Sequence, residues 1–164
     1  KKKEMADGKD LGFVGQIDHV DSEIIKNILD RDYVPIICPI GYDDEYLPYN
    51  INADDAAYSV ATSLKAAKLA FLTDVEGLYS DFNDKSTLIS EIRIDDAKAL
   101  LQSGDIKGGM IPKLTNCISA IEKGVSRVHI LDGRIPHSLL LEIFTNKGVG
   151  TAIIGNNEEK FMKD

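Results

Sequence analysis

The chain has 164 residues, of which 43% are apolar and 28% are charged, and its formal net charge is −8. This length allows one domain with a real hydrophobic core, and the acidic balance argues against general nucleic-acid binding, which needs a basic face. No apolar run approaches the roughly 20 residues of a membrane-spanning helix and no signal peptide is visible, so we expect a cytoplasmic protein that binds neither nucleic acid nor membrane.

The two cysteines, Cys38 and Cys117, stand in apolar surroundings. We interpret both as small buried residues in a reducing compartment, rather than as a disulfide pair. No cluster of histidine and cysteine has the spacing of metal ligands, so no protein-bound metal is expected.

The chain starts with a polar segment, residues 1–10, which predicts a loop. Partial alternation of apolar and polar residues over 11–21 predicts a half-buried strand. Asp21 or Ser22 offers an N-cap for a helix over residues 22–32.

The next segments continue the alternation of extended and helical patterns. The continuous apolar run VPIICPI at 34–40 predicts a strand that is buried on both faces, and the turn-rich residues 41–50 suggest a small hairpin. An alanine-rich helix is predicted over 54–66. A second buried strand follows at 68–73, and a polar loop at 74–85.

The second half of the chain repeats this order. Residues 90–104 start extended and become a helix, and the glycine turn at 105–111 enters another helix at 112–124. A strand, a turn, a helix and a last strand follow at 126–131, 132–134, 136–148 and 150–154, before a tail at 156–164 that we expect to fray. This alternation is typical of an α/β fold with a largely parallel sheet and helices on both faces, in which ligands bind beyond the carboxyl ends of the strands.

Asn50, Asn52 and Asp54 stand at alternate positions just before the alanine-rich helix. In an extended segment, Asn50 and Asn52 point to the same side. Two interpretations stay open. Either Asp54 is an N-cap and the asparagines are turn residues, or Asn50 holds a polar substrate while Asp54 orients cationic groups. We interpret Asn52 as structural.

A glycine-containing loop follows the strand FLT, at Thr73 to Tyr79. It stands at the carboxyl end of a strand, where a nucleotide could lie, although many α/β proteins have such a loop.

The segment DIKGGMIPK suggests an anion site, because Gly108 and Gly109 let the backbone approach a ligand closely. Pro112 fits the first turn of a helix. Lys113 then lies near a helix N-terminus, which disfavours a cation unless a phosphate is bound there. The alternative is a plain turn with an exposed lysine.

Towards the end of the chain, His129 falls in a strand and is most simply a structural, partly buried histidine. Glu142 falls in an otherwise apolar helix, which is harder to explain by packing. Gly148, Gly150 and Thr151 form a turn where the backbone could meet a small ligand.

Five segments of the sequence together resemble the acetylglutamate kinases of the amino acid kinase family, and they occur in the same order and at the same spacings as in that family. These segments are LGFVGQI, YNINADDAA, FLTDVEGLY, GGMIPK and HILDGRIPHSLLLEIFTNKGVGT. The resemblance covers residues 11–155. It implies the C-terminal, nucleotide-binding portion of a three-layer α/β/α, carbamate kinase-like fold. It also implies a reaction, in which ATP phosphorylates the γ-carboxylate of N-acetyl-L-glutamate during arginine biosynthesis.

The resemblance carries roles onto matching positions. It implies that Asn50 contacts N-acetyl-L-glutamate, that Asp54 orients catalytic lysines, and that Lys113 stabilises the transferring phosphoryl group. The resemblance also implies that ATP, together with Mg²⁺, is the co-substrate. The residues implied to contact ATP are Thr73, Asp74, Val75, Glu76, Gly77, Leu78, Tyr79, Asp105, Ile106, Lys107, Gly108 and Gly109.

Arginine-inhibited members of the family line their arginine site with residues that match His129, Glu142 and Gly148, so L-arginine is an implied ligand. The family's N-terminal lobe finds no match in this sequence. We therefore expect little kinase activity from this chain alone, and an exposed edge or apolar face that favours a homo-oligomer. The alternative is a noncatalytic module that senses nucleotide or arginine, or that assembles with another chain.

Overall fold

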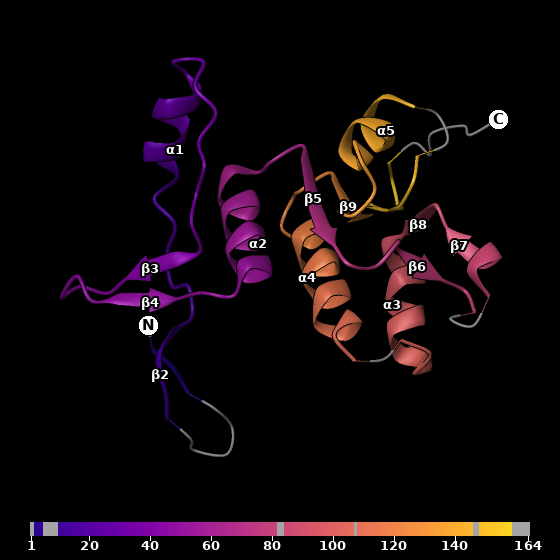
Figure 1. Cartoon of the computed structure of the whole chain (residues 1–164), viewed down its shortest axis with the longest axis horizontal. Helices are drawn as coiled ribbons and strands as arrows, with labels where there is room; N and C mark the ends of the chain where they lie inside the picture. The colour runs from indigo at the N-terminus through magenta and orange to yellow at the C-terminus, as the bar shows by residue number, and fades with distance from the viewer. Residues whose placement is uncertain (1, 5–9, 82–83, 107, 146–147, 159–164) are drawn as a thin grey trace. The chain divides into compact units, whose positions relative to one another are not determined.

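A computed structural model describes residues 2–4, 10–81, 84–106, 108–145 and 148–158. The chain divides into two compact units, Lys1–Leu64 and Lys65–Asp164 (Figure 1). No helix in the described ranges is long and apolar enough to cross a membrane.

The first unit contains a small sheet with the strand order β1-β2-β4-β3. β1 (Lys2–Glu4) pairs antiparallel with β2 (Asp10–Gly15), and β2 pairs parallel with β4 (Pro48–Asn50). β3 (Ile40–Tyr42) and β4 form the predicted hairpin. The prediction of a loop is wrong for Lys2–Glu4, because backbone pairing with β2 does not depend on apolar side chains.

Two helices complete the first unit, α1 (Ser22–Leu29) and α2 (Ala53–Leu64). α1 starts as predicted, because the Asp21 carboxylate accepts hydrogen bonds from the Glu23 and Ile24 amides at 3.1 and 3.4 Å. It ends at Leu29, before the predicted end.

The apolar segment at 34–40 is not the buried strand that its composition predicts. Only Ile40 joins a strand, and Val34 and Ile36 are 86% and 93% exposed. Cys38 is exposed too, so its predicted burial is wrong. A strand buried on both faces must belong to a sheet whose two faces are covered by other elements, and within the described part of the first unit no strand pairs with residues 34–39. An exposed apolar segment results.

The second unit contains a sheet with the order β5-β9-β10-β8 (Figure 1). β5 (Lys68–Thr73) runs parallel to β9 (Arg127–Asp132), and β10 (Thr151–Ile154) runs parallel to β8 (Glu91–Arg93). β9 and β10 are antiparallel, so this sheet is mixed. The strands predicted in these four places are confirmed.

The predicted loop after β5 contains a strand of its own. β6 (Leu78–Tyr79) pairs antiparallel with β7 (Leu88–Ile89), and a single turn, η1 (Lys85–Thr87), precedes β7. The polar composition of residues 74–85 predicted a loop throughout and gave no indication of β6, whose Leu78 is buried.

Helices cover both faces of the second sheet. β5 and β9 pair Ala70 with His129 and Phe71 with Ile130, so Phe71 and His129 point to opposite faces. α4 (Met110–Glu122) brings Lys113 over the Phe71 ring, and α5 (Ser138–Phe144) brings Glu142 against His129. α3 (Ile94–Ser103) packs beside α4. The predicted α/β class and its three layers are confirmed in this unit.

The core of the second unit is apolar and lies between this sheet and its helices. Its most fully buried residues are Leu114, Cys117, Val125, Val128, Ile130, Leu131, Ile153 and Ile154. The burial predicted for Cys117 is thereby confirmed.

Candidate functional site

The residues assigned to the phosphoryl acceptor, Asn50 and Asp54, lie in the first unit. Asn50 is the exposed last residue of β4, where it pairs with Val14 and Ile40. The Asn52 side chain accepts hydrogen bonds from the Asp54 and Asp55 amides at 2.9 and 3.1 Å. Asn52 is therefore the N-cap of α2, as its structural interpretation requires, and the interpretation of Asp54 as the cap is wrong. Asp54 lies in the first helical turn, where the helix dipole favours a carboxylate.

The loop after β5 is held by a small group of polar side chains. Lys85 Nζ lies 2.8 Å from Glu76, and the Tyr79 hydroxyl donates to the same carboxylate. The contact with Lys85 has the larger effect and that with Tyr79 adds to it, and together they hold the pKa of Glu76 below its ordinary value. Burial and the bond to Glu76 raise the pKa of Tyr79 to about 12. Glu76 is therefore ionised and Tyr79 protonated at neutral pH, the forms in which both contacts can exist.

An aspartate–arginine pair stands beside this loop at the carboxyl end of β9. Arg134 Nε and Nη2 both donate to Asp132, each at 2.9 Å, which holds the pKa of this buried carboxyl below its usual range. The Gly133 amide donates to the Thr73 carbonyl at 2.8 Å, which joins the two strand ends. The charge of Asp74 also acts on Arg134.

The sequence predicted only a turn at residues 132–134, so it did not identify Asp132 and Arg134 as candidate site residues. A signal was present, because two opposite charges follow directly on a buried strand, at the edge where ligands bind in α/β sheets.

The N-terminus of α4 lies against the carboxyl-terminal part of β5. Lys113 Nζ is 5.4 Å from the centroid of the Phe71 ring, two residues before Thr73. This contact places Lys113 near the carboxyl-terminal part of β5, which precedes the predicted nucleotide loop at 73–79. A Cβ atom added to Gly108 or Gly109 would meet nothing within 4 Å, so the backbone before α4 is open to a ligand. Lys107 lies outside the described residues.

The other two described residues of the predicted 105–109 contact lie just after α3. Asp105 accepts a hydrogen bond from the Ser103 hydroxyl at 2.7 Å, just past the left-handed Gly104 that ends α3, and Ile106 is half-buried.

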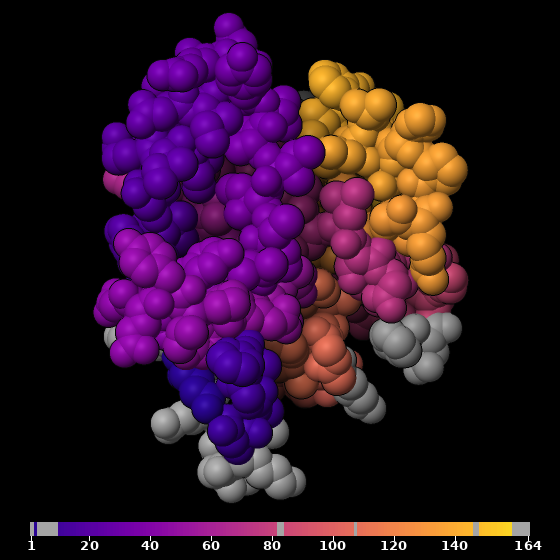
Figure 2. Space-filling model, turned by 60° about the vertical axis from the view of Figure 1, so that its left-hand side comes forward, coloured from indigo at the N-terminus to yellow at the C-terminus, as the bar shows by residue number. Residues whose placement is uncertain are grey.

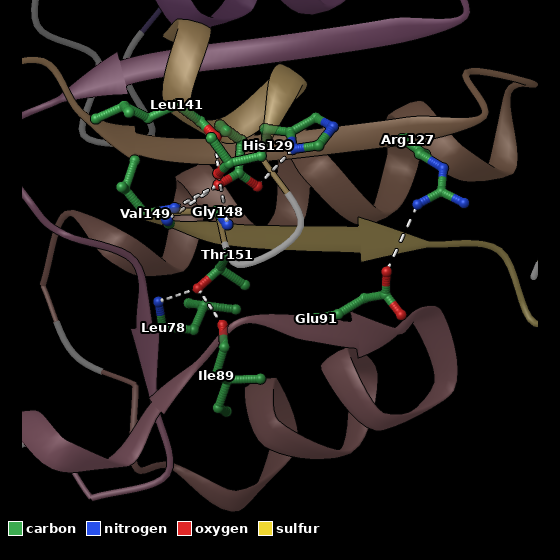
Figure 3. A network of polar contacts seen from close by, with 12 residues as sticks. Leu78, Ile89, Glu91, Arg127, His129, Leu141, Gly148, Val149 and Thr151 are labelled. Carbon is green, nitrogen blue, oxygen red and sulfur yellow. Dashed lines mark hydrogen bonds and ion pairs between the residues drawn. The ribbon is translucent and has the colours of Figure 1, made fainter. Parts of the chain in front are cut away.

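The third predicted group, His129, Glu142 and Gly148, is also brought together (Figure 3). Glu142 Oε1 lies 3.0 Å from His129 Nδ1, and Oε2 accepts from the Val149 and Gly150 amides at 2.8 and 3.1 Å. An ionised carboxylate can only accept, so His129 Nδ1 donates. Burial alone would raise the pKa of Glu142, but the bonds from His129 and the two amides outweigh burial and hold it below its ordinary value.

His129 Nε2 is buried and has no hydrogen-bond partner. Across the ranges that the structure describes, no group of three or more histidine, cysteine, aspartate or glutamate residues is placed to hold a metal ion.

Comparison with protein families and curated sequences gives one consistent match. The model of the amino acid kinase family matches residues 2–132. The acetylglutamate kinase of Campylobacter jejuni subsp. jejuni serotype O:6 is 57% identical over 145 residues, and that of Caldanaerobacter subterraneus subsp. tengcongensis is 53% identical over 152 residues. These alignments cover 88% and 93% of this chain but 51% and 50% of the relatives, so the chain spans about half their length.

Solved structures show the same fold. N-acetylglutamate synthase from Neisseria gonorrhoeae, in complex with coenzyme A and L-arginine, has a TM-score of 0.85 and 31% identity, over 94% of this chain and 35% of its own. Carbamate kinase from Giardia lamblia bound to AMP-PNP has a TM-score of 0.63 and 23% identity, over 84% of this chain and 45% of its own, and supports the fold alone.

Proposed function

The chain belongs to the amino acid kinase family, and we propose that it is the nucleotide-binding part of an acetylglutamate kinase. The observation that carries this proposal is the identity of 53% and 57% to acetylglutamate kinases, which extends over most of the chain. The reaction transfers the γ-phosphoryl group of ATP to the γ-carboxylate of N-acetyl-L-glutamate, in arginine biosynthesis. The bond from the γ-phosphorus to the bridging oxygen breaks and a carboxylate oxygen takes its place, which yields ADP and an acyl phosphate.

Phosphoryl transfer needs positioning and charge stabilisation more than covalent help. The open backbone at Gly108 and Gly109, followed by the N-terminus of α4, suits phosphate oxygens. Lys113 stands four residues into α4 and brings a positive charge to the carboxyl end of β5. In the proposal it stabilises the transferring group, Mg²⁺ arrives with ATP, and residues 73–79 hold adenine and ribose.

On the acceptor side, we assign Asn50 to N-acetyl-L-glutamate and Asp54 to the orientation of a catalytic lysine. Asn50 is exposed at the end of its strand, and its amide can both donate and accept. The position of Asp54 is compatible with this role, because Asn52 already serves as the cap of α2.

The chain matches about half of each relative. We therefore propose that catalysis needs residues from the other half, and that this chain alone has little kinase activity. The exposed apolar segment at 34–40 supports assembly into a homo-oligomer or with that other half. We place this reaction in the cytoplasm.

Replacement of Lys113 by alanine should weaken the binding of Mg·ATP to the purified chain at least about tenfold, because one charge-assisted contact to phosphate is lost. Isothermal calorimetry measures this directly. Lys98→Ala is the matched control, because Lys98 forms a surface ion pair with Glu122 at 2.8 Å and lies on α3. Equal Mg·ATP affinities of Lys113→Ala and the wild type would show that Lys113 does not contact the phosphates. No binding to the wild type would contradict a nucleotide site assembled within this chain.

Binding of L-arginine at His129, Glu142 and Gly148 is the second proposed function. Two observations favour it: the ionised, buried Glu142 carboxylate and the buried His129 Nε2 without a hydrogen-bond partner. The Neisseria gonorrhoeae relative, 31% identical, was solved with L-arginine.

We expect saturable heat on titration with L-arginine and much weaker binding of L-citrulline, whose neutral ureido group cannot form an ion pair with a carboxylate. Equal heats from both compounds would show that Glu142 does not recognise the guanidinium group.

A further inference from the structure

The hydroxyl of Thr151, the first residue of β10, joins the main sheet to the loop after β5. Thr151 is 0% exposed. Its Oγ1 accepts a hydrogen bond from the Leu78 amide at 2.8 Å and donates one to the Ile89 carbonyl at 2.6 Å. Leu78 and Ile89 are direct partners across the β6–β7 pair. A single hydroxyl therefore bridges both short strands and ties them to β10 (Figure 3).

The loop backbone also touches Thr151 directly. Gly77 has a φ of +153°, and a Cβ atom there would overlap Thr151 Oγ1 and lie 3.2 Å from the Thr151 amide nitrogen. Figure 2 shows the orange and yellow atoms of the C-terminal segment beside the magenta and pink atoms of the loop. The course of the loop therefore depends on where Thr151 lies.

The place of Thr151 is in turn set by Glu142. β10 begins directly after Val149 and Gly150, whose amides both donate to Glu142 Oε2. The other carboxylate oxygen is bound by His129 in β9, so the turn is fixed to the centre of the sheet. The contacts run without a break from α5 through Gly150 and its neighbour Thr151 to Leu78.

We propose that Thr151 is a positioning residue for the nucleotide loop, residues 74–79, and that Glu142 sets its place through the turn at Val149 and Gly150. The role of this loop in binding nucleotide rests on the proposed function, whereas the positioning rests on the contacts above. Only a hydroxyl can accept from Leu78 and donate to Ile89 with one atom. Valine has the same shape as threonine but would leave both buried backbone groups without a partner.

Hydrogen exchange of the Leu78 amide, measured by NMR under native conditions, tests the positioning. In the wild type this amide should exchange slowly, although β6 is only two residues long. Thr151→Val should accelerate its exchange about tenfold, while Thr151→Ser should stay close to the wild type. The Val128 amide, buried in β9 opposite Ile153, is the internal control and should not change.

Three results would overturn the positioning role. They are fast exchange of Leu78 in the wild type, unchanged exchange of Leu78 in Thr151→Val, and equal acceleration of Leu78 and Val128, which would indicate global loss of stability. The wild-type measurement decides even if Thr151→Val does not fold.

Glu142→Gln tests the second link. It should accelerate exchange at Val149, Gly150 and Leu78 together, and its effect on Leu78 should be less than additive with that of Thr151→Val. Acceleration confined to Val149 and Gly150 would overturn the role of Glu142.

Calorimetry with Mg·ATP then separates positioning from the proposed function. Weaker binding in Thr151→Val, recovered in Thr151→Ser, supports both. Exchange effects without any nucleotide binding by the wild type would contradict the nucleotide site but leave the positioning intact. Undiminished ATP binding by Thr151→Val, with Leu78 exchange accelerated, would show that the loop is positioned by Thr151 but does not hold nucleotide.

Discussion

Gly150→Ala should destabilise the second unit by about 2–4 kcal/mol, the upper range for a change that overpacks a core. A Cβ atom at Gly150 would overlap the Ile130 carbonyl oxygen and lie 2.6 Å from Leu131 Cδ2. Ile130 and Leu131 are central, fully buried residues of β9, so the backbone of the sheet would have to move. The shift would also disturb the bond from the Gly150 amide to Glu142. Urea unfolding, followed by circular dichroism, measures the loss.

Gly109→Ala is the matched control for this prediction. A Cβ atom at Gly109 meets nothing within 4 Å, and its φ of −65° suits alanine. We expect a change below about 1 kcal/mol, the cost of a less favourable residue at a helix N-terminus. Similar midpoints for the two variants would show that the turn at Gly150 can relax away from β9.

Glu142→Gln should cost about 2–3 kcal/mol at pH 7, because hydrogen bonds to a buried charged group are lost. Glutamine has nearly the same shape as glutamate, but its amide keeps one acceptor oxygen where the carboxylate uses two. It can satisfy His129 or the amides of Val149 and Gly150, and it turns an NH₂ group towards the other donors.

The difference between Glu142→Gln and the wild type should depend on pH in one direction. The folded state holds the pKa of Glu142 below the ordinary value of 4.5. Its charge therefore contributes stability that is fully present above pH 4.5 and is lost as pH falls through the lower, folded pKa. Unfolding curves between pH 7 and pH 3 should show a constant difference down to about pH 5, and then convergence.

Glu122→Gln controls for the general effect of removing a negative charge. Glu122 is half-exposed and pairs with Lys98 on the surface, so its loss should change stability by less than about 1 kcal/mol. A pH-independent difference for Glu142→Gln would mean that Glu142 is not ionised in the folded protein.

The regular elements of the second unit could be predicted from the sequence because their signals are local. The apolar runs of β5 and β9 and the apolar stripe of α4 each lie within a dozen or so residues, where periodicity is informative. The glycine pair before α4 predicted an anion site, which stays a prediction, although a Cβ atom at either glycine meets nothing within 4 Å. The resemblance to a family added the roles of Asn50, Asp54 and Lys113, which remain proposals.

Burial could not be predicted from composition alone, as residues 34–40 show. Their apolar run suits a buried strand, but burial requires partners from elsewhere in the protein, and Val34 and Ile36 are exposed. The sequence likewise predicted a largely parallel sheet, whereas strand direction depends on how β10 returns to β9 after α5.

The order of strands and helices in the second unit, and the family of the chain, could be read from the residues alone, because hydrophobic period, glycine placement and motif spacing are properties of short segments. Which distant polar groups meet depends instead on how the whole chain folds. Thr151 and Leu78 are 73 residues apart, and Arg134 lies close enough to Asp74 for their charges to interact. Such contacts form only when the folding chain closes long loops. The fold must also give every buried donor and acceptor a partner, and because this requirement acts on the whole fold, it leaves no local pattern in the sequence.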